Sequence, residues 1–112
     1  MDMARITYSR FEVWLVKLDP VKGSEIKKTR PCIIISPEEI NTHMNTVIIA
    51  PLTSTIKNYP FRINCEFQNH AGQIARDHLR SVDKIRLEKR IGVIQKDTAQ
   101  DICNLLMALF EF

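Results

Sequence analysis

The architecture of this chain follows from one stretch: Gly23-Ser24-Glu25-Ile26-Lys27-Lys28-Thr29-Arg30-Pro31-Cys32-Ile33-Ile34-Ile35-Ser36. Its first half is polar and basic, and its second half is a short apolar run rich in β-branched residues, which predicts a loop followed by a buried strand. Pro31 has no N–H to donate to a sheet, so it suits the first position of that strand, and it favours an extended conformation at Arg30. The sequence therefore predicts that the permanently charged Arg30 is held at the start of a strand, where it can bind a phosphate or carboxylate. Taken alone, an Arg-Pro pair before a strand favours the alternative, a surface ion pair of Arg30 beside an edge strand.

Short strands are expected on both sides of this stretch. Alternating or continuous apolar runs bounded by proline, asparagine and glycine predict strands over residues 11–18, 32–36, 46–51, 60–67, 73–75, 79–83 and 91–94. Ser36 is expected to cap a helix of about one turn that has Pro37 in its first position. Gln68 to Gly72 has the composition of a turn, and Lys84 to Lys89 is a charged turn with a brief helix.

One amphipathic helix is expected at the end of the chain. Asp97 is its predicted N-cap, and Gln100, three residues later, completes a variant capping box. The apolar stripe of this helix comprises Ile102, Leu105, Leu106, Leu109 and Phe110. Several short strands followed by one helix predict a mainly β fold: a small, mostly antiparallel barrel closed by a C-terminal helix, with residues 1–112 forming a single domain.

The composition is that of an ordinary globular protein, with 45% hydrophobic and 26% charged residues. The net charge of +3 permits an anionic partner without requiring one. The three cysteines, Cys32, Cys65 and Cys103, are widely spaced and odd in number, which favours reduced thiols without a zinc site. No metal or cofactor is expected. The sequence shows neither a secretory signal nor a membrane-spanning run, so we expect a cytoplasmic protein that does not contact a membrane.

Two polar clusters are candidates for a functional site. A short connection between the strands at 32–36 and 46–51 predicts antiparallel neighbours, which brings Arg30 close to Leu52-Thr53-Ser54-Thr55 and outlines an anion site made of a guanidinium and hydroxyls. The alternative is that these hydroxyls belong to an ordinary loop. The second cluster runs from Arg76 to Leu87, and a charge-dense run of this kind is usually a solvated face. Its Val82, Ile85 and Leu87 are expected to fix Asp77, His78 and Arg80 against the core.

The order of these motifs resembles the MazF/PemK family, the messenger-RNA-cleaving toxins of bacterial toxin–antitoxin pairs. Motifs similar to those of the family span most of the chain: Val13-Trp14-Leu15-Val16-Lys17-Leu18-Asp19-Pro20-Val21-Lys22-Gly23-Ser24-Glu25, Thr29-Arg30-Pro31-Cys32-Ile33-Ile34-Ile35-Ser36, Ala50-Pro51-Leu52-Thr53-Ser54, Tyr59-Pro60-Phe61, and Asp77-His78-Leu79-Arg80-Ser81-Val82-Asp83-Lys84 with Arg86-Leu87. Each motif is weak alone, and the ordered set is specific. The sequence departs from the family in having Lys27-Lys28 where glycine is common, His78 in place of the usual glutamine, and Ala75 where some members have arginine.

The resemblance implies a Src-homology-3-like small barrel of the CcdB/PemK type, with a C-terminal helix, that works as a homodimer. It also implies metal-independent, sequence-specific cleavage of single-stranded RNA, in which the ribose 2′-hydroxyl attacks the phosphate and leaves a cyclic phosphate and a 5′-hydroxyl. The family's catalytic arginine and threonine map onto Arg30 and Thr53.

The resemblance further implies an RNA-binding groove in the dimer, to which the residues available here are Glu25, Lys28, Asp77, His78 and Arg80. The disordered acidic tail of a cognate antitoxin is expected to cover the same surface. Two other functions compete with the ribonuclease. One is a non-enzymatic gyrase poison on the same barrel, for which the C-terminal Leu109-Phe110-Glu111-Phe112 carries no clear signature, and the other is a plain protein-binding barrel.

Overall fold

The computed structural model describes residues 6–18, 29–53, 63–68, 70–74 and 79–110. The described elements are β1 (Glu12–Lys17), β2 (Thr29–Ile34), α1 (Glu38–His43), β3 (Thr46–Thr53), β4 (Ile63–Phe67), β5 (His70–Ile74), β6 (Arg80–Asp83), the 3-10 helix η2 (Lys84–Arg86), β7 (Leu87–Val93) and α2 (Lys96–Leu109). The expected strand at 60–67 and the strand at 73–75 extend in part into residues outside this description.

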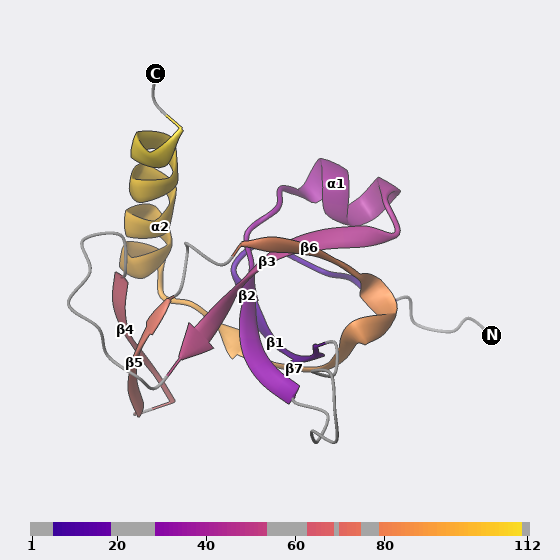
Figure 1. Cartoon of the computed structure of the whole chain (residues 1–112), viewed down its shortest axis with the longest axis horizontal. Coiled ribbons are helices and arrows are strands. Elements are labelled where there is room, and N and C mark those ends of the chain that lie inside the picture. Colours follow the sequence, from indigo (N-terminus) through magenta and orange to yellow (C-terminus); the bar gives the residue numbers. More distant parts are fainter. Residues whose placement is uncertain (1–5, 19–28, 54–62, 69, 75–78, 111–112) are drawn as a thin grey trace, which may run out of the picture.

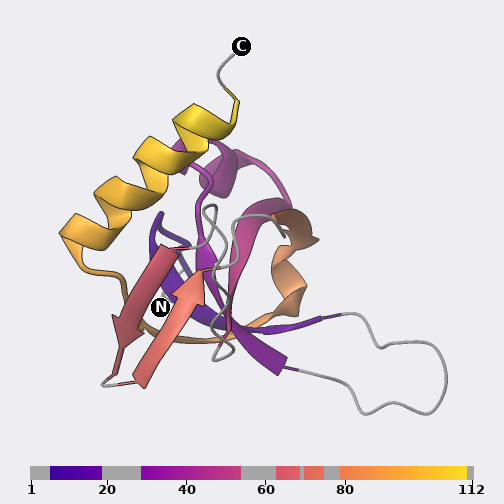
Figure 2. The ribbon, with the colours of Figure 1, turned by 60° about the vertical axis from the view of Figure 1, so that its left-hand side comes forward.

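The strands form one curled antiparallel sheet. Their order is β4-β5-β3-β2-β1-β7, and β6 also pairs with β3. β3 connects two parts of the sheet, because it pairs with β2 and β6 along most of its length and with β5 at its last two residues. Figure 1 shows β1, β2, β3, β6, η2 and β7 around a ring, and Figures 1 and 2 both place α2 beside the β4–β5 hairpin. The predicted mainly β fold with a C-terminal helix is confirmed.

β2 is buried on both faces, which explains its continuous apolar run. Ile33 and the following Ile35 lie in a core that α2 also contacts, whereas Cys32 and Ile34 lie in a second core inside the ring. Because successive side chains of a strand point to opposite faces, a run of apolar residues is needed to supply both cores. This arrangement fixes the register of β2 and therefore the position of the polar residues at its start.

The start of β2 differs from the prediction. The strand begins at Thr29 rather than at Pro31. Residues 29–31 pair with β1, and the pairs with β3 begin only at Cys32. Pro31 thus occupies a position where β2 has a partner strand on one side only, which a residue without an N–H tolerates.

Both helix caps were predicted wrongly. α1 is preceded by Pro37 as its N-cap, because the Ser36 hydroxyl instead donates to the buried Asn41 side chain and accepts from the backbone N–H of Ile48. α2 has Gln95 as its N-cap, and Asp97 lies in the first turn, where a carboxylate is favoured by the helix dipole.

The expected apolar stripe of α2 is confirmed in part. Ile102 is fully buried, and Leu105 and Leu106 pack against the core. Phe110 is instead 74% exposed, because it lies at the C-cap of the helix, one residue beyond its last turn.

The β4–β5 connection is tighter than the composition suggested. Phe67 pairs directly with His70, so His70 and the two residues after it belong to β5 rather than to a turn. Gln68 has a positive φ of 52°, a left-handed conformation that suits a two-residue hairpin. The strands β3 and β7 are also longer than predicted.

Candidate functional site at the end of the barrel

Arg30 lies at the end of the ring where β2 begins. Its backbone pairs with Val16 of β1, whose side chain is fully buried in the ring core. Residues paired across antiparallel strands share a face, so Arg30 and Val16 lie on the same face. Cys32, two residues on, shares that face by strand alternation. Arg30 therefore follows the buried ring-core residues at the end of the barrel where β2 begins, which we call the rim. Its side chain is half-buried there.

Arg80 is the first residue of β6. Because β2 and β6 both run antiparallel to β3, they are parallel to each other. Arg80 pairs with Ile49 in the middle of β3, a member of the ring core, and its side chain is exposed. The positive charges of Arg30 and Arg80 both act on the Cys32 thiol, so the two arginines approach the ring core from separate strands.

Both charges act on the thiol of Cys32. Burial raises its pKa to about 12, and the positive charges of Arg30 and Arg80 oppose that rise. Its Sγ also donates a weak hydrogen bond of 3.6 Å to the carbonyl of Arg30. The Cys32 thiol therefore stays protonated and uncharged at neutral pH. Because nucleophilic chemistry needs the thiolate, Cys32 does not serve as a nucleophile.

Thr53 ends β3 at the same rim. The observed pairs of β2 and β3 run from Ile34–Ile49 to Cys32–Pro51 and stop two residues before Arg30 and Thr53. The predicted antiparallel pairing of these strands is confirmed. Thr53 is half-buried and pairs with Gln73 of β5, and it lines one cavity together with Pro31, the neighbour of Arg30.

A cavity of about 250 Å³ opens beside Thr53. It lies between the end of β3, the start of β2, the β4–β5 hairpin and β7, and its lining residues are Pro31, Leu52, Thr53, Cys65, Phe67, Gln68, Ala71, Gly72 and Ile91. The prediction of the site did not include this cavity. Its walls come from four separate parts of the chain, and no local motif marks them.

Four of the predicted groove residues, Glu25, Lys28, Asp77 and His78, lie outside the described residues. Ser54 and Thr55 of the expected hydroxyl cluster do so as well. Of the predicted site, the described residues are Arg30, Thr53 and Arg80.

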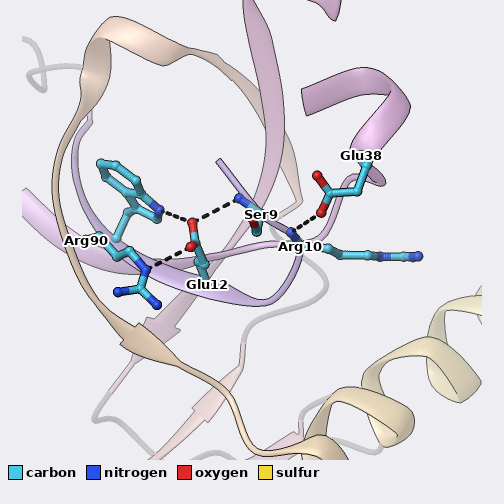
Figure 3. Close-up of polar contacts among 6 residues, drawn as sticks. Ser9, Arg10, Glu12, Glu38 and Arg90 are labelled. Atoms are coloured by element: carbon cyan, nitrogen blue, oxygen red, sulfur yellow. Dashed lines mark hydrogen bonds and ion pairs between the residues drawn. The ribbon is translucent and has the colours of Figure 1, made fainter. Parts of the chain in front are cut away.

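A second polar cluster lies away from this rim and is structural (Figure 3). The buried carboxylate of Glu12 accepts hydrogen bonds from Trp14 Nε1 at 2.9 Å, from the backbone N–H of Ser9 at 2.9 Å and from Arg90 Nε at 2.8 Å. These contacts tie β1 to β7 and to the segment before β1. A buried carboxylate with three donors needs no ligand to satisfy it.

Within the described part of the chain, no three His, Cys, Asp or Glu side chains are grouped so that they could hold a metal ion. A helix long and apolar enough to cross a membrane is likewise absent from those residues.

The rim combines two guanidinium groups, one hydroxyl and a neutral buried thiol. Guanidinium groups bind phosphate oxygens through paired, charge-assisted hydrogen bonds, and a threonine hydroxyl can donate to the same anion. The chemistry that this rim can support is therefore recognition of a phosphate and stabilisation of negative charge that develops on it.

Known proteins with a similar sequence pattern or fold were compared with this chain. Residues 9–110 match the family model described as the PemK-like, MazF-like toxin of type II toxin–antitoxin systems. The fold is similar to that of MazF from Deinococcus radiodurans, with a TM-score of 0.79, 23% identity, and coverage of 96% of this chain and 100% of that one. It is also similar to a MazE–MazF complex from the same organism, with a TM-score of 0.82, 23% identity and coverage of 94% and 96%. An endoribonuclease from a mycobacterial species gives a TM-score of 0.75, 20% identity and coverage of 92% and 90%. The match over residues 9–110 shows that this chain belongs to the PemK-like, MazF-like family of type II toxins.

Proposed function

We propose that this toxin is a sequence-specific, metal-independent endoribonuclease that cleaves single-stranded messenger RNA. The ribose 2′-hydroxyl loses its proton to solvent as its oxygen attacks the adjacent phosphorus, the bond from phosphorus to the 5′-oxygen breaks, and the 5′-oxygen takes up a proton, so the products carry a cyclic phosphate and a 5′-hydroxyl. The observation that carries this proposal is that Arg30 lies at the start of β2 beside Pro31, which lines one cavity together with Thr53 at the end of β3, in a chain whose family is that of MazF-like toxins.

Arg30 is assigned to the scissile phosphate. Charge accumulates on the non-bridging oxygens as the 2′-oxygen bonds to phosphorus, and a fixed guanidinium stabilises that charge without reorganisation. Its place on β2, between a buried Val16 partner and the buried Cys32, keeps it oriented before substrate binds. Arginine is a poor free base because its guanidinium stays protonated at any working pH, so its role is electrostatic, with hydrogen bonds donated to the phosphate.

Thr53 is assigned to a non-bridging oxygen of the same phosphate. Its hydroxyl can donate one hydrogen bond to the developing oxyanion, and its position at the end of a paired strand preorganises that donor. Arg80 is assigned to substrate binding at a neighbouring phosphate, because it is exposed and its charge, like that of Arg30, acts on the Cys32 thiol.

The RNA-binding surface is proposed to include Glu25, Lys28, Asp77 and His78 together with Arg80. A homodimer would set two such rims along one groove, and single-stranded RNA would be read there by stacking and by hydrogen bonds to base edges. The acidic disordered tail of a cognate antitoxin would compete for the same basic groove. The similarity to MazF in a MazE–MazF complex supports an antitoxin partner.

The test is incubation of the purified protein with a long single-stranded RNA in EDTA, followed by sequencing of the 5′ ends of the fragments. Discrete cuts at one short motif with 5′-hydroxyl ends are expected, together with loss of these cuts in Arg30→Ala. Lys89→Ala, which removes an exposed cation from β7, is the matched control and should cut like the wild type.

Absence of cuts at any concentration of wild-type protein would overturn the ribonuclease assignment. Inhibition of purified gyrase under the same conditions would then favour the non-enzymatic toxin. Cleavage by the wild type that survives in Arg30→Ala would overturn the role of Arg30.

A further inference from the structure

The cavity beside Thr53 has the size and lining of a site for one partly apolar group. Its volume is about 250 Å³, and its walls are mostly apolar, with Phe67, Cys65 and Ile91 among them. It shares Thr53 with the phosphate rim, and Pro31, the neighbour of Arg30, also lines it. A group bound in the cavity would therefore lie next to a phosphate held at the rim.

Building on the ribonuclease function, we propose that this cavity holds one unpaired base of the RNA, next to the scissile phosphate, and selects a base that carries an exocyclic amine. The proposal rests on two side chains of the β4–β5 hairpin: Phe67 stacks on the base, and Gln68 reads its edge.

Gly92 of β7 leaves the space that the Phe67 ring occupies. A Cβ at Gly92 would lie 2.6 Å from Cζ and 2.9 Å from Cε1 of the Phe67 ring, so a larger residue at this position would force the ring to shift. Phe67 is half-buried, packs against the core and lines the cavity. Single-stranded RNA is recognised by stacking its unpaired bases on aromatic rings, and a ring packed against the core loses little freedom when a base stacks on it.

A hydrogen bond to the backbone of β7 fixes the orientation of the Gln68 side-chain amide. Its Nε2 donates to the carbonyl of Ile91 at 3.0 Å, and because a carbonyl can only accept, the NH₂ end of the amide must face it. The Oε1 end is then an acceptor for a ligand in the cavity. The amines of adenine, cytosine and guanine can donate to it, whereas the single edge N–H of uracil lies between two carbonyl oxygens that the acceptor would repel.

An RNA base fits these features better than an apolar side chain of an antitoxin. An apolar side chain has no use for an oriented acceptor, and burying Gln68 Oε1 without a donor would carry a cost. A base in RNA is also linked to a phosphate through its ribose. This matches the position of Thr53, which lines the cavity and also lies at the rim.

The decisive experiment pairs a base analogue with a Gln68 variant. After the preferred motif is mapped, each amine-bearing base in it is replaced in turn by the analogue that lacks the amine, such as purine ribonucleoside for adenosine. At one position next to the cut, wild-type kcat/KM should fall about tenfold, the effect of one buried hydrogen bond. In Gln68→Met the same replacement should change kcat/KM by less than about twofold. Gln100→Met, on the exposed face of α2, should behave like the wild type.

A second measurement tests the stacking surface by binding alone. Phe67→Leu should weaken binding of an RNA oligonucleotide with a 2′-deoxy residue at the cut about 5- to 150-fold, the range for one base stacked on an aromatic ring. Gly92→Ala should weaken it as well, because the new methyl pushes the ring into the cavity. Thermal melting of both variants confirms that the barrel is folded.

The outcomes separate this proposal from the ribonuclease function. If the wild type cuts RNA and the amine effect persists unchanged in Gln68→Met, the cavity does not read the base. If folded Phe67→Leu and Gly92→Ala bind the oligonucleotide like the wild type but lose the cognate antitoxin, the cavity is a protein site and the proposal is wrong. If the wild type does not cut RNA, the function itself has failed.

Discussion

Substitutions at Arg30 can separate the contribution of its charge to cleavage from that of its planar guanidinium. Arg30→Lys keeps a positive charge but loses the planar fork that binds two phosphate oxygens at once. We expect Arg30→Lys to cleave RNA more slowly than the wild type, and Arg30→Ala more slowly still. Single-turnover cleavage rates of the three proteins check this order. Equal rates for Arg30→Lys and wild type would show that charge alone suffices.

Thr53→Val removes the hydroxyl and keeps the shape of the side chain. If the hydroxyl stabilises the oxyanion, kcat should fall by about 10²- to 10³-fold, whereas Thr53→Ser should retain most activity. The measurement is single-turnover cleavage, with thermal melting to show that each variant is folded. A Thr53→Val protein that cleaves like the wild type would remove Thr53 from the catalytic site.

At the scale of the elements, the contact between β1 and β7 depends on the buried Glu12. Glu12→Ala leaves the Trp14 indole N–H and the Ser9 N–H without their acceptor and Arg90 without its partner. The expected loss is about 1–3 kcal/mol in the free energy of unfolding, measured by urea denaturation.

Glu88→Ala is the matched control on β7. Glu88 pairs with Lys17 at 3.3 Å, and both side chains are more than 40% exposed, so this pair should contribute at most about 1 kcal/mol. A Glu12→Ala protein no less stable than Glu88→Ala would show that the Glu12 contacts do not hold the strands together.

Most strands were predictable because their signals are local. Each predicted strand rests on an apolar run in the sequence, and the apolar run of β2 indicates burial on both faces; the prolines are a weaker signal, because Pro31 and Pro51 lie inside β2 and β3. The caps were not predictable in this way, since the Ser36 hydroxyl bonds to the Asn41 side chain and the Ile48 N–H instead of capping the first turn of α1. That choice depends on how α1 packs against β3, which no local pattern records.

At the scale of the whole molecule, burial of Cys32 makes stability depend on pH. The pKa of its thiol is raised from 9.0 to about 12 in the folded protein, so above pH 9 the unfolded chain loses this proton before the folded one does. The free energy of unfolding should therefore fall as the pH rises from 9 towards 12, by up to about 1.4 kcal/mol per pH unit from this group. Below pH 9 the thiol should contribute no slope.

Cys32→Val isolates this effect, because it keeps an apolar side chain of similar size and removes the titrating group. Urea denaturation at several pH values between 8 and 11 should show a shallower loss of stability in the variant than in the wild type. Parallel losses in the two proteins would show that Cys32 is not the group responsible.

The candidate site was predictable only in part, and the reason lies in sequence separation. Arg30 directly precedes Pro31, Thr53 follows Pro51 by two residues, and a short connection makes their strands antiparallel neighbours. The cavity joins Pro31, Phe67 and Ile91, and the Glu12–Arg90 pair spans 78 positions. Such contacts arise when the sheet closes, so they leave no motif in the sequence.

The decisive measurement is cleavage of an RNA oligonucleotide with a single 2′-deoxy residue at the cut ribose. We expect the wild type to cut the all-RNA oligonucleotide in EDTA and to bind the 2′-deoxy oligonucleotide with similar affinity but leave it uncut, because the attacking oxygen is missing. Cleavage of the 2′-deoxy oligonucleotide at the same bond would contradict attack by the 2′-hydroxyl, and with it the roles assigned to Arg30 and Thr53 at the rim of the barrel.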